Sequence, residues 1–241
     1  LKKRDIEDTN LMCAGGVFGN VRITHKLKNI PMINDIFVQP QMGDGGLCLG
    51  AAALSQHIQG INIKPMKNAF LGPEVDLNSF KDNCLNDDGL CIVDSADIKY
   101  SICNDLQSNY LIGLVRGRME FGPRALCNRS ILCRTSDPEI NISINKRLKR
   151  TEFMPFAPVI REEIGEIAFK GYKPNDKTLE YMTSTIDCTD YFKSYSPAVV
   201  HIDQTARPQI IRKSQNLFIW ELLKQWEECS GELSIVNTSF N

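Results

Sequence analysis

Short apolar runs separated by glycine turns dominate the first sixty residues. Residues 11–14 and 36–38 are apolar and predict two strands. Glycine turns follow them at 15–16 and 43–46, and the Ala-rich stretch 47–57 predicts a helix. The order of strand, turn, strand, turn and helix is typical of an α/β fold.

The pattern resumes near residue 95, after it weakens between residues 61 and 90. We therefore predict a first unit at 1–72, a linker at 73–94 and a second unit at 95–241. In the second unit the apolar pattern predicts helices at 97–108, 137–150 and 217–229, and strands at 110–115, 130–133, 156–160, 198–202 and 233–236. The fold class is mixed α/β.

Composition and charge narrow the class of protein. The 241 residues are 42% apolar and 24% charged, with a formal net charge of -1. The charge argues against a dedicated nucleic-acid binder. No apolar run approaches the roughly 20 residues that span a bilayer, and no secretory signal is visible. The nine cysteines include no CxxC, which indicates reduced thiols in a cytoplasmic protein rather than a zinc site.

An arginine-rich loop follows the predicted strand at 110–115. Glycines in this loop would let the backbone approach a ligand closely, and arginines suit phosphate oxygens. Pro123 is expected to start a short helix whose N-terminus faces the anion. A surface loop with exposed arginines explains the composition equally well. The residues concerned are Gly113, Arg116, Gly117, Arg118, Glu120, Gly122, Arg124 and Arg129.

Further candidates lie at the ends of other predicted elements. Lys149 ends a basic helix, which the helix dipole explains as well as a phosphate contact does. Arg207 belongs to a His-Asp-Arg group at a strand exit, where ligands or a salt bridge are both expected. Asp44 lies between glycines and suits either a metal or a turn. The segment Asn237, Thr238 and Ser239 offers amides and hydroxyls.

Five ordered motifs resemble one known family. Residues 117–132 read GRMEFGPRALCNRSIL, which is similar to GRMEFGPRALGNRSIL of the NodU/CmcH-type O-carbamoyltransferases. Residues 149–158, 201–207 and 237–241 resemble that family's KxREPFRPFAP, HxDGTAR and NTSFN, and residues 13–17 with 43–52 resemble the end of its Kae1-like domain. The resemblance covers almost the whole chain. It implies the end of an ASKHA/Kae1-like domain followed by a YrdC-like twisted-sheet domain.

The resemblance also implies a reaction and its residues. A carbamoyl group from carbamoyl phosphate would be activated with ATP as carbamoyl-adenylate and passed to a hydroxyl of a small-molecule or sugar acceptor. Mg²⁺ would accompany the ATP, and an iron-like divalent metal would lie in the Kae1-like part. The implied catalytic residues are Arg124, Lys149, Arg207 and Ser239; the implied substrate- and nucleotide-binding residues are Arg118, Gly122, Asn237, Thr238, Gly15 and Gly16; the implied metal ligand is Asp44.

Three departures from the family pattern bear on activity. Cys127 replaces a glycine, and Met154 replaces an arginine. The family's metal-binding HxxxH is absent, so we expect a fragment, truncated also at its end, that lacks the N-terminal half of the Kae1-like domain and does not complete the transfer. A YrdC-like tRNA-modification factor and a non-catalytic nucleotide- or anion-binding module remain as alternatives.

Overall fold

The computed structural model describes residues 8–76, 97–147, 149 and 156–240. Strands β1 (Thr9–Cys13) and β2 (Ile33–Val38) pair in parallel, as two predicted strands separated by a crossover should. The crossover is helix α1 (Val21–Lys28), which the apolar pattern did not predict. It begins at Asn20, whose side chain accepts a hydrogen bond from the Arg22 backbone at 3.1 Å. A strand–helix–strand unit therefore replaces the expected turn between the strands.

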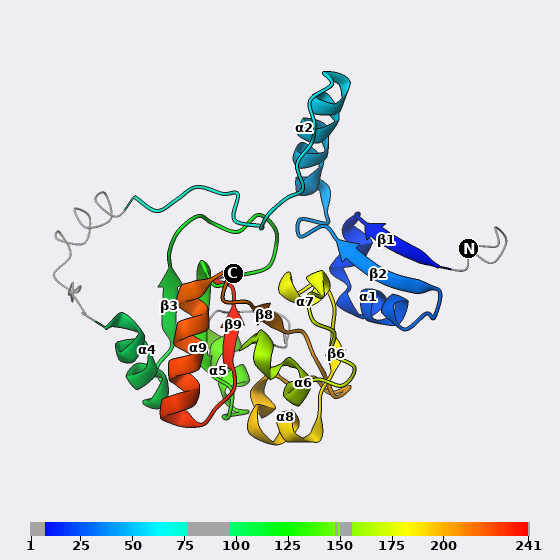
Figure 1. The fold of residues 1–241 in the computed structure, drawn as a ribbon. Helices are drawn as coiled ribbons and strands as arrows, with labels where there is room; N and C mark the ends of the chain where they lie inside the picture. The colour runs from blue at the N-terminus through cyan, green and yellow to red at the C-terminus, as the bar shows by residue number, and fades with distance from the viewer. Residues whose placement is uncertain (1–7, 77–96, 148, 150–155, 241) are drawn as a thin grey trace.

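Helix α2 (Leu47–Ile58) follows the 3-10 turn η3 (Asp44–Gly46) and confirms the predicted Ala-rich helix. It projects away from the rest of the chain (Figure 1), and none of its residues is buried. Leu47, Leu54 and Ile58 leave 71%, 58% and 76% of their surface exposed. Helix α2 thus presents apolar side chains that nothing in the described chain covers.

The second unit is built on a five-stranded sheet with the order β3-β4-β9-β5-β8. All neighbouring strands are antiparallel except β5 and β8. The strands are β3 (Ile112–Val115), β4 (Arg129–Arg134), β5 (Ala157–Arg161), β8 (Gln209–Ile211) and β9 (Ile235–Thr238). The mixed α/β class is confirmed, and four of these strands lie at or within a few residues of their predicted positions.

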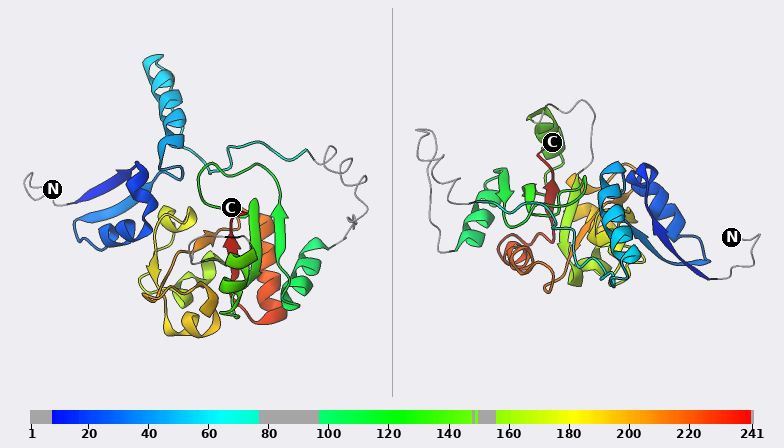
Figure 2. Two further views of the ribbon diagram at one scale, coloured as in Figure 1. Left: turned by 180° about the vertical axis from the view of Figure 1, so that it is seen from behind. Right: turned by 90° about the horizontal axis from the view of Figure 1, so that it is seen from above.

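Two apolar layers cover the sheet because successive strand residues point to opposite faces. Val159 and Ile235 face helices α4 (Ile98–Gln107) and α9 (Leu217–Ser230), which supply Leu106 and the fully buried Trp226. The neighbouring strand residues Ile160 and Val236 face the other layer. Helices α5 (Ile140–Arg147), α6 (Gly165–Ala168) and α8 (Asp190–Tyr195) contribute residues to that layer. In the right-hand view of Figure 2, α5 (green) and α9 (orange) lie on opposite sides of the sheet.

Two local predictions in this unit are wrong. Residues 198–202 form no strand: Pro197–Val199 is a 3-10 turn, η5, whose apolar side chains are buried as irregular structure. Pro123 starts no helix either, because residues 121–124 form a series of bends. Several short elements were not predicted, namely α6, α7 (Lys177–Glu180), α8, β6 (Ile186–Asp187), β7 (Thr205–Ala206) and β8.

Helix α1 joins the first unit to the second. Arg22 pairs with Asp203 at 2.6 Å, Lys28 pairs with Asp176, and His25 Nδ1 lies 3.0 Å from the Thr185 hydroxyl. These contacts set α1 beside α7 and β6 (Figure 1). Most of the predicted linker at 73–94 lies outside the described residues, so the proposed domain limits remain predictions. No helix in the described part of the chain has the length and apolarity that crossing a membrane requires.

Candidate functional site

The arginine-rich loop connects β3 to β4, whose last register pair is Val115 and Arg129. Gly122 has a φ of 137°, and a Cβ atom there would lie 2.7 Å from the carbonyl oxygen of Pro40. Only glycine combines that backbone angle with that close approach. The loop therefore lies directly against the segment that follows β2.

Three arginines of the loop have structural partners. Arg118 donates from Nε and Nη2 to the carbonyls of Gly72 and Leu71 at 3.0 and 2.8 Å. Arg129 donates to four backbone carbonyls, including Arg116 O at 2.7 Å. Arg116 donates to the side chains of Asn128 and Asn216 and lies over the Phe218 ring. These guanidinium groups fix the segment 71–73 and the loop itself, so the predicted ligand role of Arg118 has no support in its contacts.

Arg124 and Arg207 differ from the other arginines. Burial lowers the pKa of both, and Arg124 lies close enough to Arg207 to lower the pKa of Arg207 further, to about 9. Neither forms an ion pair within the part of the chain that is described, and the buried Nε of each lacks a hydrogen-bond partner there. Arg124 keeps one contact, from Nη2 to Gly19 O at 2.9 Å. Two half-buried like charges with no carboxylate partner in the described chain would be stabilised by a bound anion.

A hollow of about 240 Å³, which we call the arginine hollow, brings three predicted residues together. Gly122, Arg124 and Ser239 all line it. The other lining residues are Met119, Glu120, Pro123, Ala125, Arg129 and Phe240. The predicted loop and the predicted strand-end serine therefore meet, although they are more than a hundred residues apart in the sequence.

The residues of the motif at the end of β9 have different surroundings. Asn237 lies within β9 and is buried, and its Nδ2 donates to Ala125 O at 2.8 Å and to Gln209 Oε1 at 2.7 Å. Thr238 is the last residue of the strand and is half-buried. Asn237 thus ties the arginine loop to the sheet, a role that its sequence position did not indicate.

Cys127 has a φ of 69°, in the left-handed region that a glycine adopts without strain. Its backbone N–H donates to Ser130 Oγ at 3.0 Å, and its thiol donates to Gln209 Oε1 at 3.2 Å. The family's glycine at this place is therefore explained by the backbone angle. The cysteine here adds a buried contact to β8 in exchange for strain of roughly 1 kcal/mol.

Lys149 and Met154 are less informative. Lys149 is exposed just beyond α5 with a φ of 50°, and no hydrogen bond or ion pair within the described chain joins its side chain to Arg124 or Arg207. Met154, Glu152 and Pro155 lie outside the described residues. The role expected of Lys149 remains a prediction.

The glycine turns of the first unit meet at a second hollow, of about 380 Å³. Gly15 and Asp44 both line it, and the Gly15 backbone N–H donates to Met42 O at 2.7 Å. Gly16 begins the 3-10 turn η2 (Gly16–Gly19), which ends at the carbonyl that Arg124 contacts. Asp44 is exposed, and the residues that the structure describes contain no group of three or more His, Cys, Asp or Glu side chains suited to a metal. Asp44 alone does not make a metal site.

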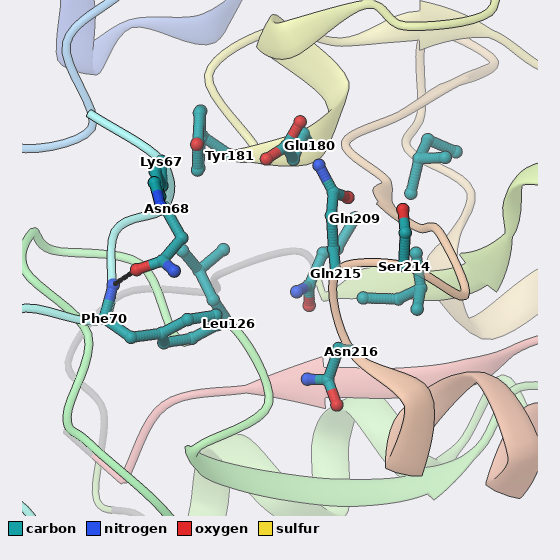
Figure 3. A pocket seen from close by; sticks show the side chains of 12 residues that line it. Lys67, Asn68, Phe70, Leu126, Glu180, Tyr181, Gln209, Ser214, Gln215 and Asn216 are labelled. Carbon is teal, nitrogen blue, oxygen red and sulfur yellow. Dashed lines mark hydrogen bonds between the residues drawn. The ribbon is translucent and has the colours of Figure 1, made fainter. Parts of the chain in front are cut away.

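A third hollow, also of about 240 Å³, lies between the segment 67–70, helix α7, strand β8 and the start of α9 (Figure 3). We call it the carboxamide hollow, because Asn68, Gln209, Gln215 and Asn216 line it together with the rings of Phe70 and Tyr181. Leu126 borders this hollow and Ala125 borders the arginine hollow, so the same loop separates the two. None of the predicted site residues lines the carboxamide hollow, and two of the elements that form it, α7 and β8, were not predicted by the apolar pattern.

His201 is a half-buried residue near Arg207, and its Nε2 is buried without a hydrogen-bond partner in the described chain. Burial and the Arg207 charge lower its pKa to about 4, although the nearby Asp203 carboxylate acts in the opposite direction and raises the pKa. Between this value and the ordinary 6.5, the unfolded chain binds more protons than the folded one. The free energy of unfolding therefore falls as the pH drops from about 6.5 to about 4, by about 3 kcal/mol from this residue at most.

Urea unfolding of the His201→Gln variant at pH 7 and pH 4.5 measures that contribution. We expect the variant to lose less stability than the wild type on acidification. Some loss remains, because burial also lowers the pKa of His25. His57→Gln, on the exposed helix α2, is the control and should follow the wild type. Equal losses in all three proteins would contradict the neutral, buried state of His201.

Comparison with known proteins identifies the family. The protein-family model described as "Carbamoyltransferase C-terminus" matches residues 103–241, and "Carbamoyltransferase N-terminus" matches residues 2–53. The chain belongs to the carbamoyltransferase family, as the motifs indicated.

Three relatives show how much of such a protein this chain represents. Nodulation protein NolO of Bradyrhizobium diazoefficiens is 32% identical over 97% of this chain and 43% of its own length. Nodulation protein U of Rhizobium tropici is 29% identical over 96% of this chain and 38% of its own length. An uncharacterized protein of Methanocaldococcus jannaschii is 36% identical over 96% of this chain and 44% of its own length. The chain therefore spans less than half the length of the curated relatives it matches.

Proposed function

We propose that this chain carries the activation site of an O-carbamoyltransferase, in which carbamoyl phosphate and ATP yield carbamoyl-adenylate. The observation that carries the proposal is the pair Arg124 and Arg207, which are half-buried, have buried Nε atoms, interact through their like charges and have no carboxylate partner in the described chain. Carbamoyl phosphate, adenylate and pyrophosphate are all anions that such a pair would bind. Ser239 and Gly122 line the same hollow as Arg124.

The chemistry of the step suits preorganised cations. Carbamoyl phosphate loses phosphate and ATP loses pyrophosphate, with one water consumed, and the carbamoyl group ends bonded through oxygen to the α-phosphorus. Negative charge develops on oxygen at both centres, and fixed guanidinium groups in a site of low polarity stabilise it. The carboxamide hollow supports a neighbouring nucleoside subsite, since amides and two aromatic rings suit a planar base with a polar edge.

We propose that the acceptor site and the transfer step belong to the part of the relatives that this chain does not cover. The acceptor is then a hydroxyl of a small molecule or sugar. An iron-like metal would need ligands besides Asp44. The uncovered apolar side chains of α2 would pack against the part of the relatives that this chain does not cover. Mg²⁺ would enter with ATP. The chain alone is then expected to activate carbamoyl phosphate without completing the transfer.

Isotope exchange between pyrophosphate and ATP tests the proposal. With the purified chain, exchange should require carbamoyl phosphate and should be absent with acetyl phosphate or with ATP alone. A folded chain that binds carbamoyl phosphate but catalyses no exchange would be a binding module instead. Binding of tRNA that weakens with salt, without any effect of carbamoyl phosphate, would favour the RNA-modification alternative.

A further inference from the structure

Glu120 has an unusual set of partners for a buried carboxylate. It is 7% exposed, and its Oε1 accepts three backbone hydrogen bonds, from Leu126 N at 2.8 Å, Asn128 N at 2.7 Å and Arg129 N at 3.0 Å. Within the described residues no Lys, Arg or His side chain forms an ion pair with it. Among the described residues, the hydrogen bonds to this carboxylate therefore come from the backbone of its own loop.

These three bonds close the chain around Arg124, which lies between Glu120 and Leu126 in the sequence. On one side, Phe121 N donates to Ala69 O at 2.6 Å. On the other, Asn237 holds Ala125 O. Both flanks of Arg124 are thus attached to fixed points, and the Glu120 carboxylate joins the two flanks to each other.

Arg124 needs such an anchor because its own position is unfavourable. Burial disfavours its charge, Arg207 lies close by with the same charge, and Arg124 has a single carbonyl contact, to Gly19. A free loop would let a long side chain of this kind move its guanidinium into water. Hydrogen bonds to an ionised acceptor are about twice as strong as neutral ones, which suits a carboxylate to this purpose.

We propose that Glu120 is a positioning residue of the site: it holds the loop so that the half-buried Arg124 guanidinium stays near Arg207, in place to bind an anion. The identity of the anion, carbamoyl phosphate, rests on the proposed function. The positioning role involves no contact between Glu120 and the substrate.

A double-mutant cycle on the purified chain tests this role. The dissociation constants for carbamoyl phosphate and for inorganic phosphate are measured by calorimetry for the wild type, Glu120→Ala, Arg124→Met and the double variant. Glu120→Ala is expected to weaken binding of carbamoyl phosphate about tenfold or more, and the double variant should bind no more weakly than Arg124→Met alone. Glu166→Ala, an exposed carboxylate on α6, is the control and should match the wild type.

Two conservative variants separate positioning from simple folding. Glu120→Gln keeps an oxygen acceptor for the three N–H groups and should weaken binding only about threefold, since the acceptor loses its charge. Glu120→Asp keeps the charge but is one methylene shorter, and should resemble Glu120→Ala. This pair replaces Glu120→Ala if that variant does not fold. Hydrogen exchange should accelerate at the Leu126, Asn128 and Arg129 amides in Asp and Ala variants without any ligand.

The outcomes distinguish the two ideas. The positioning role would be overturned if the losses of binding free energy in the cycle were additive. It would also be overturned if the wild type bound carbamoyl phosphate and Glu120→Ala bound it equally well. A folded wild type that binds neither anion would overturn the proposed function. Accelerated exchange at the three amides would then show that the loop anchor exists but serves another purpose, which also rejects the positioning role for carbamoyl phosphate.

Discussion

Replacing Arg207 with Met is expected to lower carbamoyl-phosphate-dependent pyrophosphate exchange by about two to three orders of magnitude, the usual effect of removing one preorganised donor to a developing oxyanion. The same change should raise the free energy of unfolding, by about 1 kcal/mol, because it removes a half-buried charge whose buried Nε has no partner in the described chain. Exchange assays and urea unfolding of the same preparation measure both effects.

Arg212→Met is the matched control. The Arg212 side chain is only 12% exposed, but it is paired with Glu162 at 2.8 Å and with Glu180 at 3.1 Å. Its loss leaves the half-buried Glu162 without its cation and leaves the buried Glu180 paired with Lys177 alone, and it should destabilise the chain by about 3 kcal/mol. If Arg207→Met destabilises the chain as Arg212→Met does, Arg207 is a structural arginine and the anion site is wrongly assigned.

Gly122→Ala is expected to cost about 3 kcal/mol of stability and to weaken carbamoyl phosphate binding at least about tenfold. The added methyl group meets a backbone carbonyl, Pro40 O, at 2.7 Å, and the φ of 137° is itself unfavourable for alanine. The loop must then move away from the first unit, which breaks the contact between Arg124 and Gly19. Thermal unfolding and calorimetry measure the two losses.

Gly171→Ala isolates the contribution of backbone angle. Gly171 has a φ of 66°, but a Cβ atom there would meet nothing within 4 Å. This variant should lose only about 1 kcal/mol and should bind carbamoyl phosphate normally. Equal effects of the two substitutions would show that the contact with Pro40 does not hold the loop in place.

Periodicity predicted the elements that are long and have one apolar side. Helices α4 and α9 and strands β4 and β5 belong to this group. It failed between residues 161 and 216, where α6 and α7 have four residues each and carry too few positions for a period. The run 198–202 was mistaken for a strand because a buried 3-10 turn and a buried strand share the same apolar composition.

The positions of the candidate residues could be predicted in part, while their roles stay predictions. Sequence order indicated the loop, Arg207 and Ser239, and the structure joins the loop to Ser239 and Arg124 to Arg207. Sequence could not separate the arginines that contact backbone carbonyls, Arg118 and Arg129, from those left for an anion, because composition does not reveal such contacts. The same holds for Glu120, whose three partners are backbone N–H groups of its own loop.

Calorimetric titration of carbamoyl phosphate into the chain tests the central claim, that Arg124 and Arg207 form an anion site, most directly. We predict one binding site per chain, which weakens with added salt and is lost in the Arg124→Met/Arg207→Met double variant while that variant remains folded. A double variant that binds carbamoyl phosphate as tightly as the wild type, or a folded wild type that does not bind it, would contradict the account.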